Sequence, residues 1–289
     1  MKEIKYNLQI NSFKSGYFKT SDGAKLNYLE AGSGQPLVMI PGWSQTAEQF
    51  KYQIEDLSTE YHCIAVDMRG HGDSENVEYG YRIQRLAKDL REFLSGLELN
   101  EIFLLGHSMG CSVIWSYWDM FGSKNIRKLV LVDEPPFLLS NPAWSDKEYE
   151  ESGALTDPEE LIDTFNKLSG PDGESITRIM LQNMFSATIS ANELEWIISC
   201  NLKLPRRLAA KLILNNSVQD WRDVIPRINV PTLVVGAKGS QVSWKSQKWI
   251  HKNIPGSVFI LFEESEGGKH FMFYENPEKF NRVVKEFLG

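Results

Sequence analysis

The run GHSMG at residues 106–110 constrains the fold of this chain more than any other segment. It follows a short apolar segment, residues 102–105, and precedes a helical pattern over residues 109–121. A serine at a sharp strand-to-helix turn has strained backbone angles, and flanking glycines prevent collisions with the neighbouring strand and helix. The pattern therefore predicts that the hydroxyl of Ser108 projects above one edge of a sheet, at the N-terminus of a helix.

Short segments rich in Val, Ile and Leu alternate with helical patterns along most of the chain. These segments are apolar on both sides, which is typical of strands in a parallel sheet covered by helices on both faces. The helical pattern is clearest over residues 81–97, where apolar side chains recur at helical spacing. The alternation predicts an α/β fold with a doubly wound, mostly parallel sheet. The predicted strands are residues 37–40, 63–66, 102–105, 129–132, 231–235 and 258–262.

Two segments depart from this alternation. Residues 6–31 predict a hairpin of alternating strands that turns at residues 21–23 and adds an antiparallel edge to the sheet. After residue 132, roughly ninety residues of helical and loop character precede the next strand, which is too long for a structureless loop. We expect residues 137–227 to form a helical cap, inserted into a core domain made of residues 1–136 and 228–289.

The large side chains of this insertion suit two roles. They can pack the cap onto the core domain, or they can form an apolar wall over an active site. The side chains concerned are Trp144, Phe165, Met180, Met184, Phe185, Trp196 and Trp221.

Four motifs follow one another along the chain in the same order as in the α/β-hydrolase family and resemble that family's motifs. The resemblance covers nearly the whole chain. Besides the GHSMG run, IPGW at residues 40–43 resembles the family's oxyanion loop. DMRGHGDS at residues 67–74 resembles the family's D-x-R-G-x-G-x-S turn. GKH at residues 268–270 resembles its C-terminal histidine loop. The resemblance implies an α/β-hydrolase fold with an inserted helical cap.

The same resemblance implies catalytic roles for individual residues. Ser108 matches the nucleophile, and the backbone N–H groups of Trp43 and Met109 match the two donors of an oxyanion hole, which binds the charge that develops on a carbonyl oxygen. Pro41 stands where many relatives have histidine, but this change leaves the donors in place because they are main-chain groups. His270 follows the last predicted strand in a glycine-containing loop, where the family carries its general base.

The other histidines fit the role of base less well. A base must be held near the serine by the fold. His107 adjoins the serine on a tight turn, so the two side chains point apart. His62 begins a strand, His71 lies in the glycine-rich turn, and His251 lies in a helical run. We therefore expect His270 to be the base.

The acid that orients the histidine is missing from its usual place. Most relatives carry it after the strand that corresponds to residues 232–235, but residues 236–241 contain no carboxylate. Some haloalkane dehalogenases and zearalenone lactonases place the acid after the preceding strand, where this chain has Asp133 and Glu134. Asp133 is favoured because it comes first after the strand. Glu134 has the longer reach and remains the alternative.

A serine nucleophile forms an acyl-enzyme that water opens, whereas halide or epoxide opening in this fold uses an aspartate. We therefore expect a hydrolase that cleaves a small, largely apolar carboxylic ester or lactone. One alternative is the hydrolysis of carbon–carbon bonds in ring-cleavage products, whose polar substrates would need a basic group such as Arg69, Lys238 or Lys269. Another is a ligand sensor that retains the triad and uses the charged segment 145–160 to bind a partner.

The amino-acid composition limits which binding partners and which cellular location we expect for this protein. A formal net charge of −7 provides no positive field to attract nucleic acid or an anionic membrane surface. The three cysteines cannot form a complete disulfide set, and no apolar stretch reaches the length of a signal peptide or a membrane span. We expect a cytoplasmic monomer or homodimer. No cofactor is expected, since the sequence has no phosphate-binding loop and no cluster of metal ligands.

Overall fold

Eight strands form a single sheet in the computed structural model, which describes residues 13–289. The strand order is β1-β2-β4-β3-β5-β6-β7-β8, and every neighbouring pair from β4 to β8 is parallel. This topology confirms the predicted α/β-hydrolase fold with its mostly parallel sheet. The strands are β1 Lys14–Lys19, β2 Lys25–Ala31, β3 Pro36–Ile40, β4 His62–Val66, β5 Ile102–His107, β6 Ile126–Val132, β7 Thr232–Ala237 and β8 Val258–Phe262.

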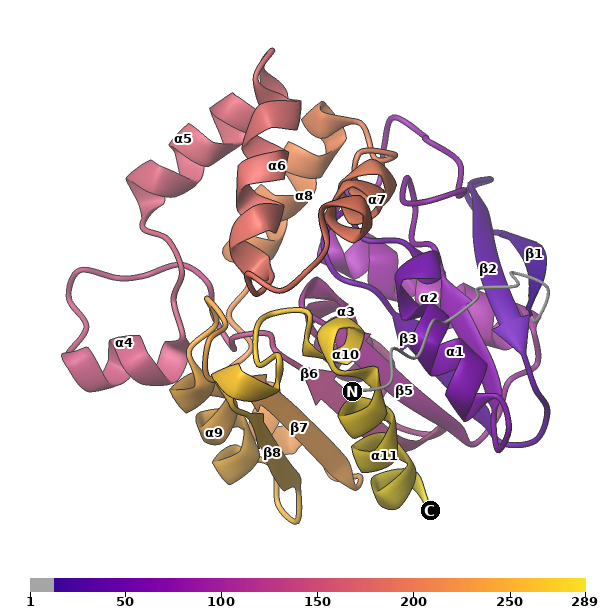
Figure 1. The fold of residues 1–289 in the computed structure, drawn as a ribbon. Coiled ribbons are helices and arrows are strands. Elements are labelled where there is room, and N and C mark those ends of the chain that lie inside the picture. Colours follow the sequence, from indigo (N-terminus) through magenta and orange to yellow (C-terminus); the bar gives the residue numbers. More distant parts are fainter. Residues whose placement is uncertain (1–12) are drawn as a thin grey trace.

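The hairpin of β1 and β2 lies at one edge of the sheet (Figure 1). β1 pairs with β2 and β2 pairs with β4, both in the antiparallel direction. Gly23 has a φ of 97° in the connecting turn, a conformation that glycine adopts without steric cost. The antiparallel edge agrees with the sequence-based expectation, but the part of the expected hairpin before residue 13 lies outside the described residues.

Helices cover both faces of the sheet (Figure 1). Side chains of a strand point alternately to its two faces, and in β5 Leu104 packs with α2, α3 and α9 while Phe103 and Leu105 pack with α1 and α11. None of the helices in residues 13–289 has both the length and the apolar character needed to cross a membrane. The helices of this part of the fold are α1 Lys51–Leu57, α2 Ile83–Gly96, α3 Met109–Phe121, α9 Trp244–Asn253, α10 Met272–Glu275 and α11 Pro277–Leu288, with 3₁₀ turns η1 Ala47–Phe50, η2 Ile225–Arg227 and η3 Glu264–Glu266.

A cap-like helical insertion connects β6 to β7. Figure 1 shows α5 to α8 gathered beyond one end of the sheet, with α4 set apart from them. Capping boxes begin both α4 and α5, because the side chains of Ser145 and Asp157 accept hydrogen bonds from backbone N–H groups of the first turn. The helices of the insertion are α4 Asp146–Ser152, α5 Pro158–Ser169, α6 Gly173–Met184, α7 Ala191–Asn201 and α8 Arg206–Ser217.

Several aromatic side chains of this insertion pack against the rest of the protein. Phe185 stacks on Phe271 with ring centroids 4.3 Å apart, and Trp196 stacks on Tyr274 at 6.2 Å. Trp221 lies 6.3 Å from Trp115 of α3. These contacts favour the packing role over the wall role for all three side chains.

The glycine-rich turn after β4 is held by a buried ion pair. The guanidinium of Arg69 is fully buried, and it donates hydrogen bonds of 2.9 Å to the carboxylates of Asp89 and Asp22. Arg85 also pairs with both carboxylates. Arg69 therefore ties the turn to α2 and to the β1–β2 hairpin.

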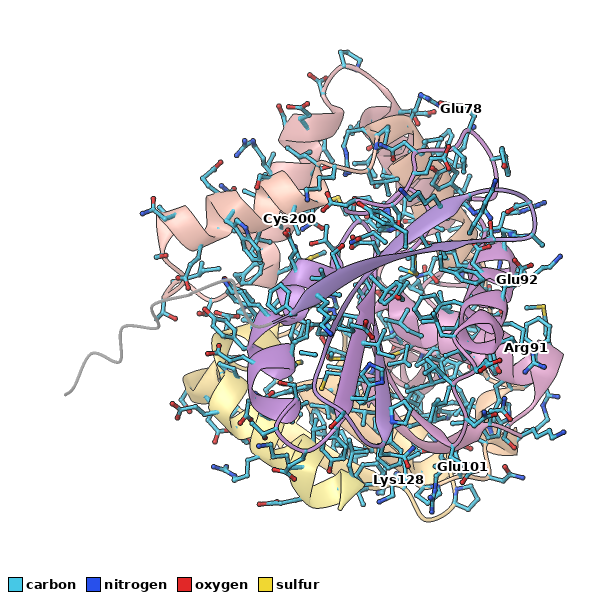
Figure 2. All side chains as sticks on the ribbon, turned by 90° about the vertical axis from the view of Figure 1, so that its right-hand side faces the viewer. Glu78, Arg91, Glu92, Glu101, Lys128 and Cys200 are labelled. Carbon is cyan, nitrogen blue, oxygen red and sulfur yellow. The ribbon has the colours of Figure 1, made fainter. Side chains whose placement is uncertain are left out.

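Replacing Arg69 by methionine is expected to lower the free energy of unfolding by about 3 kcal/mol, because Asp22 and the buried Asp89 then lose their fully buried charge partner and keep only Arg85 among the described residues. Urea denaturation measures this loss. The control is Arg207→Met, which breaks an exposed pair with Glu78 at the surface (Figure 2) and is expected to cost less than about 1 kcal/mol. Equal losses in the two variants would contradict the structural role of Arg69.

Candidate active site

Ser108 lies at the turn between β5 and α3 with φ 53° and ψ −132°. A non-glycine residue at positive φ is strained, and such strain is concentrated at functional sites. Both neighbouring glycines are needed here. A Cβ on Gly106 would lie 2.8 Å from the backbone of Gly110, and a side chain on Gly110 would collide with the carbonyl group of Ile40 in β3. The glycines thus allow β3, β5 and α3 to meet directly beneath the serine.

Two backbone N–H groups are available beside Ser108. Within residues 13–289, the N–H groups of Trp43 and Met109 donate to no other protein group, and both residues line the same cavity as Ser108. The loop that carries Trp43 is fixed because Gly42 N–H donates to Gln45 Oε1 at 2.8 Å. The indole N–H of Trp43 donates to the carbonyl of Ala209 in α8 at 2.8 Å, so its side chain also fastens the insertion to this loop.

His270 and Asp133 form a buried pair. Nδ1 of His270 lies 2.8 Å from Oδ2 of Asp133, and both side chains are almost completely buried. Asp133 follows β6 directly and has a φ of 54°. Burial raises the pKa of Asp133, although the hydrogen bond from His270 opposes this effect. Of the two carboxylates considered from the sequence, the structure brings Asp133 to the histidine.

Ser240 also contacts the His270–Asp133 pair, and it was not identified from the sequence. Its hydroxyl donates to Oδ2 of Asp133 at 2.5 Å. Ser240 belongs to the loop after β7, where the sequence lacks the usual carboxylate. A polar residue in that loop could have indicated the contact with Asp133, because β6 and β7 are parallel neighbours and the loops that follow them adjoin.

Glu134 lies beside the nucleophile. Its Oε1 accepts hydrogen bonds from Ser112 at 3.0 Å and from Asn216 at 2.9 Å, and its Oε2 lies 3.5 Å from Oγ of Ser108. Burial raises the pKa of Glu134 to about 7, against the opposing effect of the hydrogen bonds from Asn216 and Ser112. Glu134 is therefore placed at the serine and makes no hydrogen bond to His270 in the described part of the chain.

Ser108 and His270 line one cavity but are not hydrogen bonded to each other in residues 13–289. The hydroxyl of Ser108 is directed to Glu134 instead. Catalytic hydrogen bonds are often long or misaligned without substrate. A hydrogen bond between Ser108 and His270 would need a rotation of the Ser108 side chain.

His107 holds the histidine loop from below. Its ring is fully buried, and its nitrogens lie 3.0 Å from Oε1 of Gln45 and 2.8 Å from the carbonyl oxygen of His270. The ring also packs against Phe273 with centroids 4.7 Å apart. His107 thus connects the Trp43 loop to the His270 loop.

The cavity above Ser108 has a volume of about 680 Å³. Of the large cap side chains named from the sequence, Met180 and Met184 line it, and Tyr149 of α4 and Trp43 add aromatic rings to its wall. None of the described residues that line it is lysine or arginine. Its aliphatic lining comprises Leu138, Ala154, Leu155, Leu161, Ile213 and Val242.

No cluster of three or more His, Cys, Asp or Glu side chains that could hold a metal ion occurs in the part of the chain that the structure describes. The three cysteines are buried and free; Figure 2 labels Cys200, which belongs to α7.

Known proteins resemble this chain over nearly its whole length. The family model of the alpha/beta hydrolase fold matches residues 35–157. The non-heme chloroperoxidase CPO-A1 of Kitasatospora aureofaciens is 28% identical over 285 residues, which cover 93% of this chain and 98% of that protein. A bromoperoxidase structure from Bacillus anthracis has a TM-score of 0.86 at 24% identity and covers 95% of this chain and 99% of its own. An esterase structure from Exiguobacterium antarcticum has a TM-score of 0.82 at 28% identity, with coverages of 94% and 98%.

Proposed function

This chain belongs to the α/β-hydrolase fold superfamily, and on that premise we propose that it is a serine hydrolase that cleaves small, largely apolar carboxylic esters or lactones. One observation carries the proposal. The strained turn presents Ser108 to a cavity that His270 also lines, with Asp133 buried beside His270 and, within residues 13–289, two unpaired backbone donors. A nucleophile, an oriented base and an oxyanion hole are the components that acyl transfer requires.

The first half of the reaction forms an acyl-enzyme. Nε2 of His270 takes the proton of Ser108 as Oγ attacks the carbonyl carbon of the substrate. Asp133 keeps the other ring proton on Nδ1 and stabilises the imidazolium. The N–H groups of Trp43 and Met109 donate to the oxyanion. When the tetrahedral intermediate collapses, the alcohol oxygen leaves and takes the proton from His270.

The second half returns the enzyme to its starting state. A water molecule attacks the acyl carbon while His270 accepts one of its protons. The oxyanion forms again between the same two N–H groups. Collapse breaks the bond between the acyl carbon and Oγ of Ser108, which recovers its proton from His270. The products are the carboxylic acid and the alcohol, or the hydroxy acid in the case of a lactone.

The lining of the cavity supports an uncharged or cationic substrate over an anionic one. Hydrolysis of anionic ring-cleavage products would need a basic group near the substrate, and Arg69, Lys238 and Lys269 are not among the lining residues. Arg69 is instead occupied by Asp22 and Asp89. We therefore favour ester or lactone hydrolysis over carbon–carbon bond hydrolysis.

A substrate panel tests the proposal. We expect the purified protein to hydrolyse short acyl esters and lactones, and we expect an organophosphonate that modifies Ser108 to abolish this activity. A dienol ketone included in the panel checks the carbon–carbon alternative. Absence of turnover on every ester and lactone, together with failure of Ser108 to react with the organophosphonate, would overturn the proposal.

A further inference from the structure

Glu134 is a buried carboxylate in the cavity that the proposed triad does not use. The residue is only 3% exposed, and it comes from the loop after β6. The donors Ser112 and Asn216 satisfy its Oε1. Among residues 13–289, the hydrogen-bond partner of its Oε2 is the hydroxyl of Ser108, at the long distance of 3.5 Å. Since the reaction turns that hydroxyl toward His270, Oε2 loses its partner when the nucleophile acts.

His270 is the basic side chain in the described lining of the cavity, and its attraction only partly offsets the effect of burial on the pKa of Glu134. Two other carboxylates line the cavity, but both have local roles. Asp163 pairs with Lys167 at 2.6 Å, and Glu160 accepts a hydrogen bond from the backbone of Asp157 at the start of α5. The described lining contains neither lysine nor arginine. A buried carboxylate without a charge partner is costly, so a cation from the substrate would stabilise the ionised form of Glu134.

Asn216 is the neighbour of Glu134 on the cap side of the cavity. It is 4% exposed and lines the cavity from the C-terminal end of α8. Its Nδ2 donates to Glu134 at 2.9 Å, and within residues 13–289 its buried Oδ1 has no hydrogen-bond partner. An ammonium group carries three donors and no acceptor, so it can donate to the carboxylate of Glu134.

The position of Glu134 Oε2 beside Ser108 limits how far the cationic group of a substrate can be from its carbonyl group. In an acyl-enzyme the carbonyl carbon is bonded to Oγ of Ser108, which lies 3.5 Å from Oε2 before it turns toward His270. An amine on the carbon next to the carbonyl is only two bonds from the carbonyl carbon, so it stays in the part of the cavity that Ser108 and Glu134 both line. We propose that Glu134 is a specificity-determining residue that binds the ammonium group of an α-amino acyl ester; this inference rests on the proposed serine hydrolase function.

A purely structural role explains part of the geometry. Through Oε1, Glu134 connects Ser112 in α3 to Asn216 in α8, and this contact helps to hold the insertion in place. It does not account for Oε2, which faces the nucleophile. The two roles differ in what they affect: a structural role changes activity toward all esters together, whereas a binding role changes the preference between charged and uncharged ones.

A pair of matched esters measures this preference. Valine methyl ester carries the ammonium group, and methyl 2,3-dimethylbutanoate has a methyl group in its place. The ratio of their kcat/KM values is measured at neutral pH by methanol release in the wild type and in Glu134→Gln. We expect the variant to lower this ratio by roughly 10- to 100-fold, the range for a hydrogen bond to a charged group. Because the same two esters are used throughout, their intrinsic reactivities cancel.

Glu195→Gln is the matched control. Glu195 is an exposed carboxylate of α7 that pairs with Arg178, so this variant removes the same charge away from the cavity. We expect it to keep the wild-type ratio. A Glu134→Gln ratio equal to that of the wild type would overturn the inference.

Inhibition of the wild type keeps the inference testable if Glu134→Gln does not fold. Valinamide is expected to inhibit hydrolysis of the neutral ester with an inhibition constant roughly tenfold or more below that of 2,3-dimethylbutanamide. Equal constants would overturn the inference while the serine hydrolase function stands. Absence of hydrolysis of both esters, with Ser108 unreactive toward an organophosphonate, would overturn the proposed function and the inference with it.

Discussion

Ser108→Ala is expected to lower kcat for ester hydrolysis by about 10⁵- to 10⁶-fold, which corresponds to about 7 to 8 kcal/mol of transition-state stabilisation. The variant cannot form the acyl-enzyme, and what remains is the contribution of the oxyanion hole and of substrate binding. The fold should be retained, because alanine has the same steric cost as serine at the φ of 53° found here. Steady-state kinetics on the best ester of the panel measure kcat, and urea denaturation measures the stability of the fold.

Ser116→Ala is the control for this experiment. Ser116 is a buried serine of α3, the helix that begins directly after Ser108, and it does not line the cavity. We expect this variant to keep its activity. A Ser108→Ala protein that is folded and hydrolyses esters at the wild-type rate would show that another group attacks the substrate.

Asp133→Asn is expected to lower kcat by about 10⁴-fold, or about 5 kcal/mol. An asparagine amide in place of the carboxylate can present its NH₂ group to Nδ1 of His270, which then favours the wrong tautomer. It also removes the negative charge that stabilises the imidazolium. The cause lies in a 2.8 Å contact between two buried side chains, so solvent cannot replace the missing charge. Single-turnover kinetics measure the loss at the acylation step.

Glu134→Gln provides the comparison that separates the two carboxylates. On a neutral ester we expect Asp133→Asn to cause a much larger loss than Glu134→Gln, since only Asp133 contacts His270. The opposite result, with Asp133→Asn fully active and Glu134→Gln inactive, would make Glu134 the acid and our assignment wrong.

Much of the fold is predictable from local sequence patterns because the sheet is buried on both faces. Continuous apolar segments mark β3 to β8, and the helical pattern over residues 81–97 corresponds to α2, Ile83–Gly96. Short connections also bring the turn at Ser108 directly between a predicted strand and a predicted helix. The elements inside the insertion are harder to predict, because its helices pack on each other and on the core through contacts between residues far apart in sequence.

The same limit applies to the candidate site. The motifs indicate Ser108 and His270. The lack of a carboxylate in the loop after β7 indicates that the acid comes from the loop after β6. The contact of Ser240 with Asp133 depends on how two loops adjoin, and the contact of Asn216 with Glu134 depends on how α8 meets the core. Neither contact has a signature in the order of residues. Phe185, Trp196 and Trp221 of the insertion show the converse: their size suggests a pocket wall, but they pack against Phe271, Tyr274 and Trp115 respectively.

The most direct test of Ser108 as the nucleophile is mass spectrometry of the protein after reaction with a p-nitrophenyl organophosphonate. We expect a single phosphonyl adduct on the peptide that contains Ser108, loss of esterase activity in step with labelling, and much slower labelling of His270→Ala. An adduct on a different residue, or full activity in protein whose Ser108 has been completely modified, would contradict this role of Ser108.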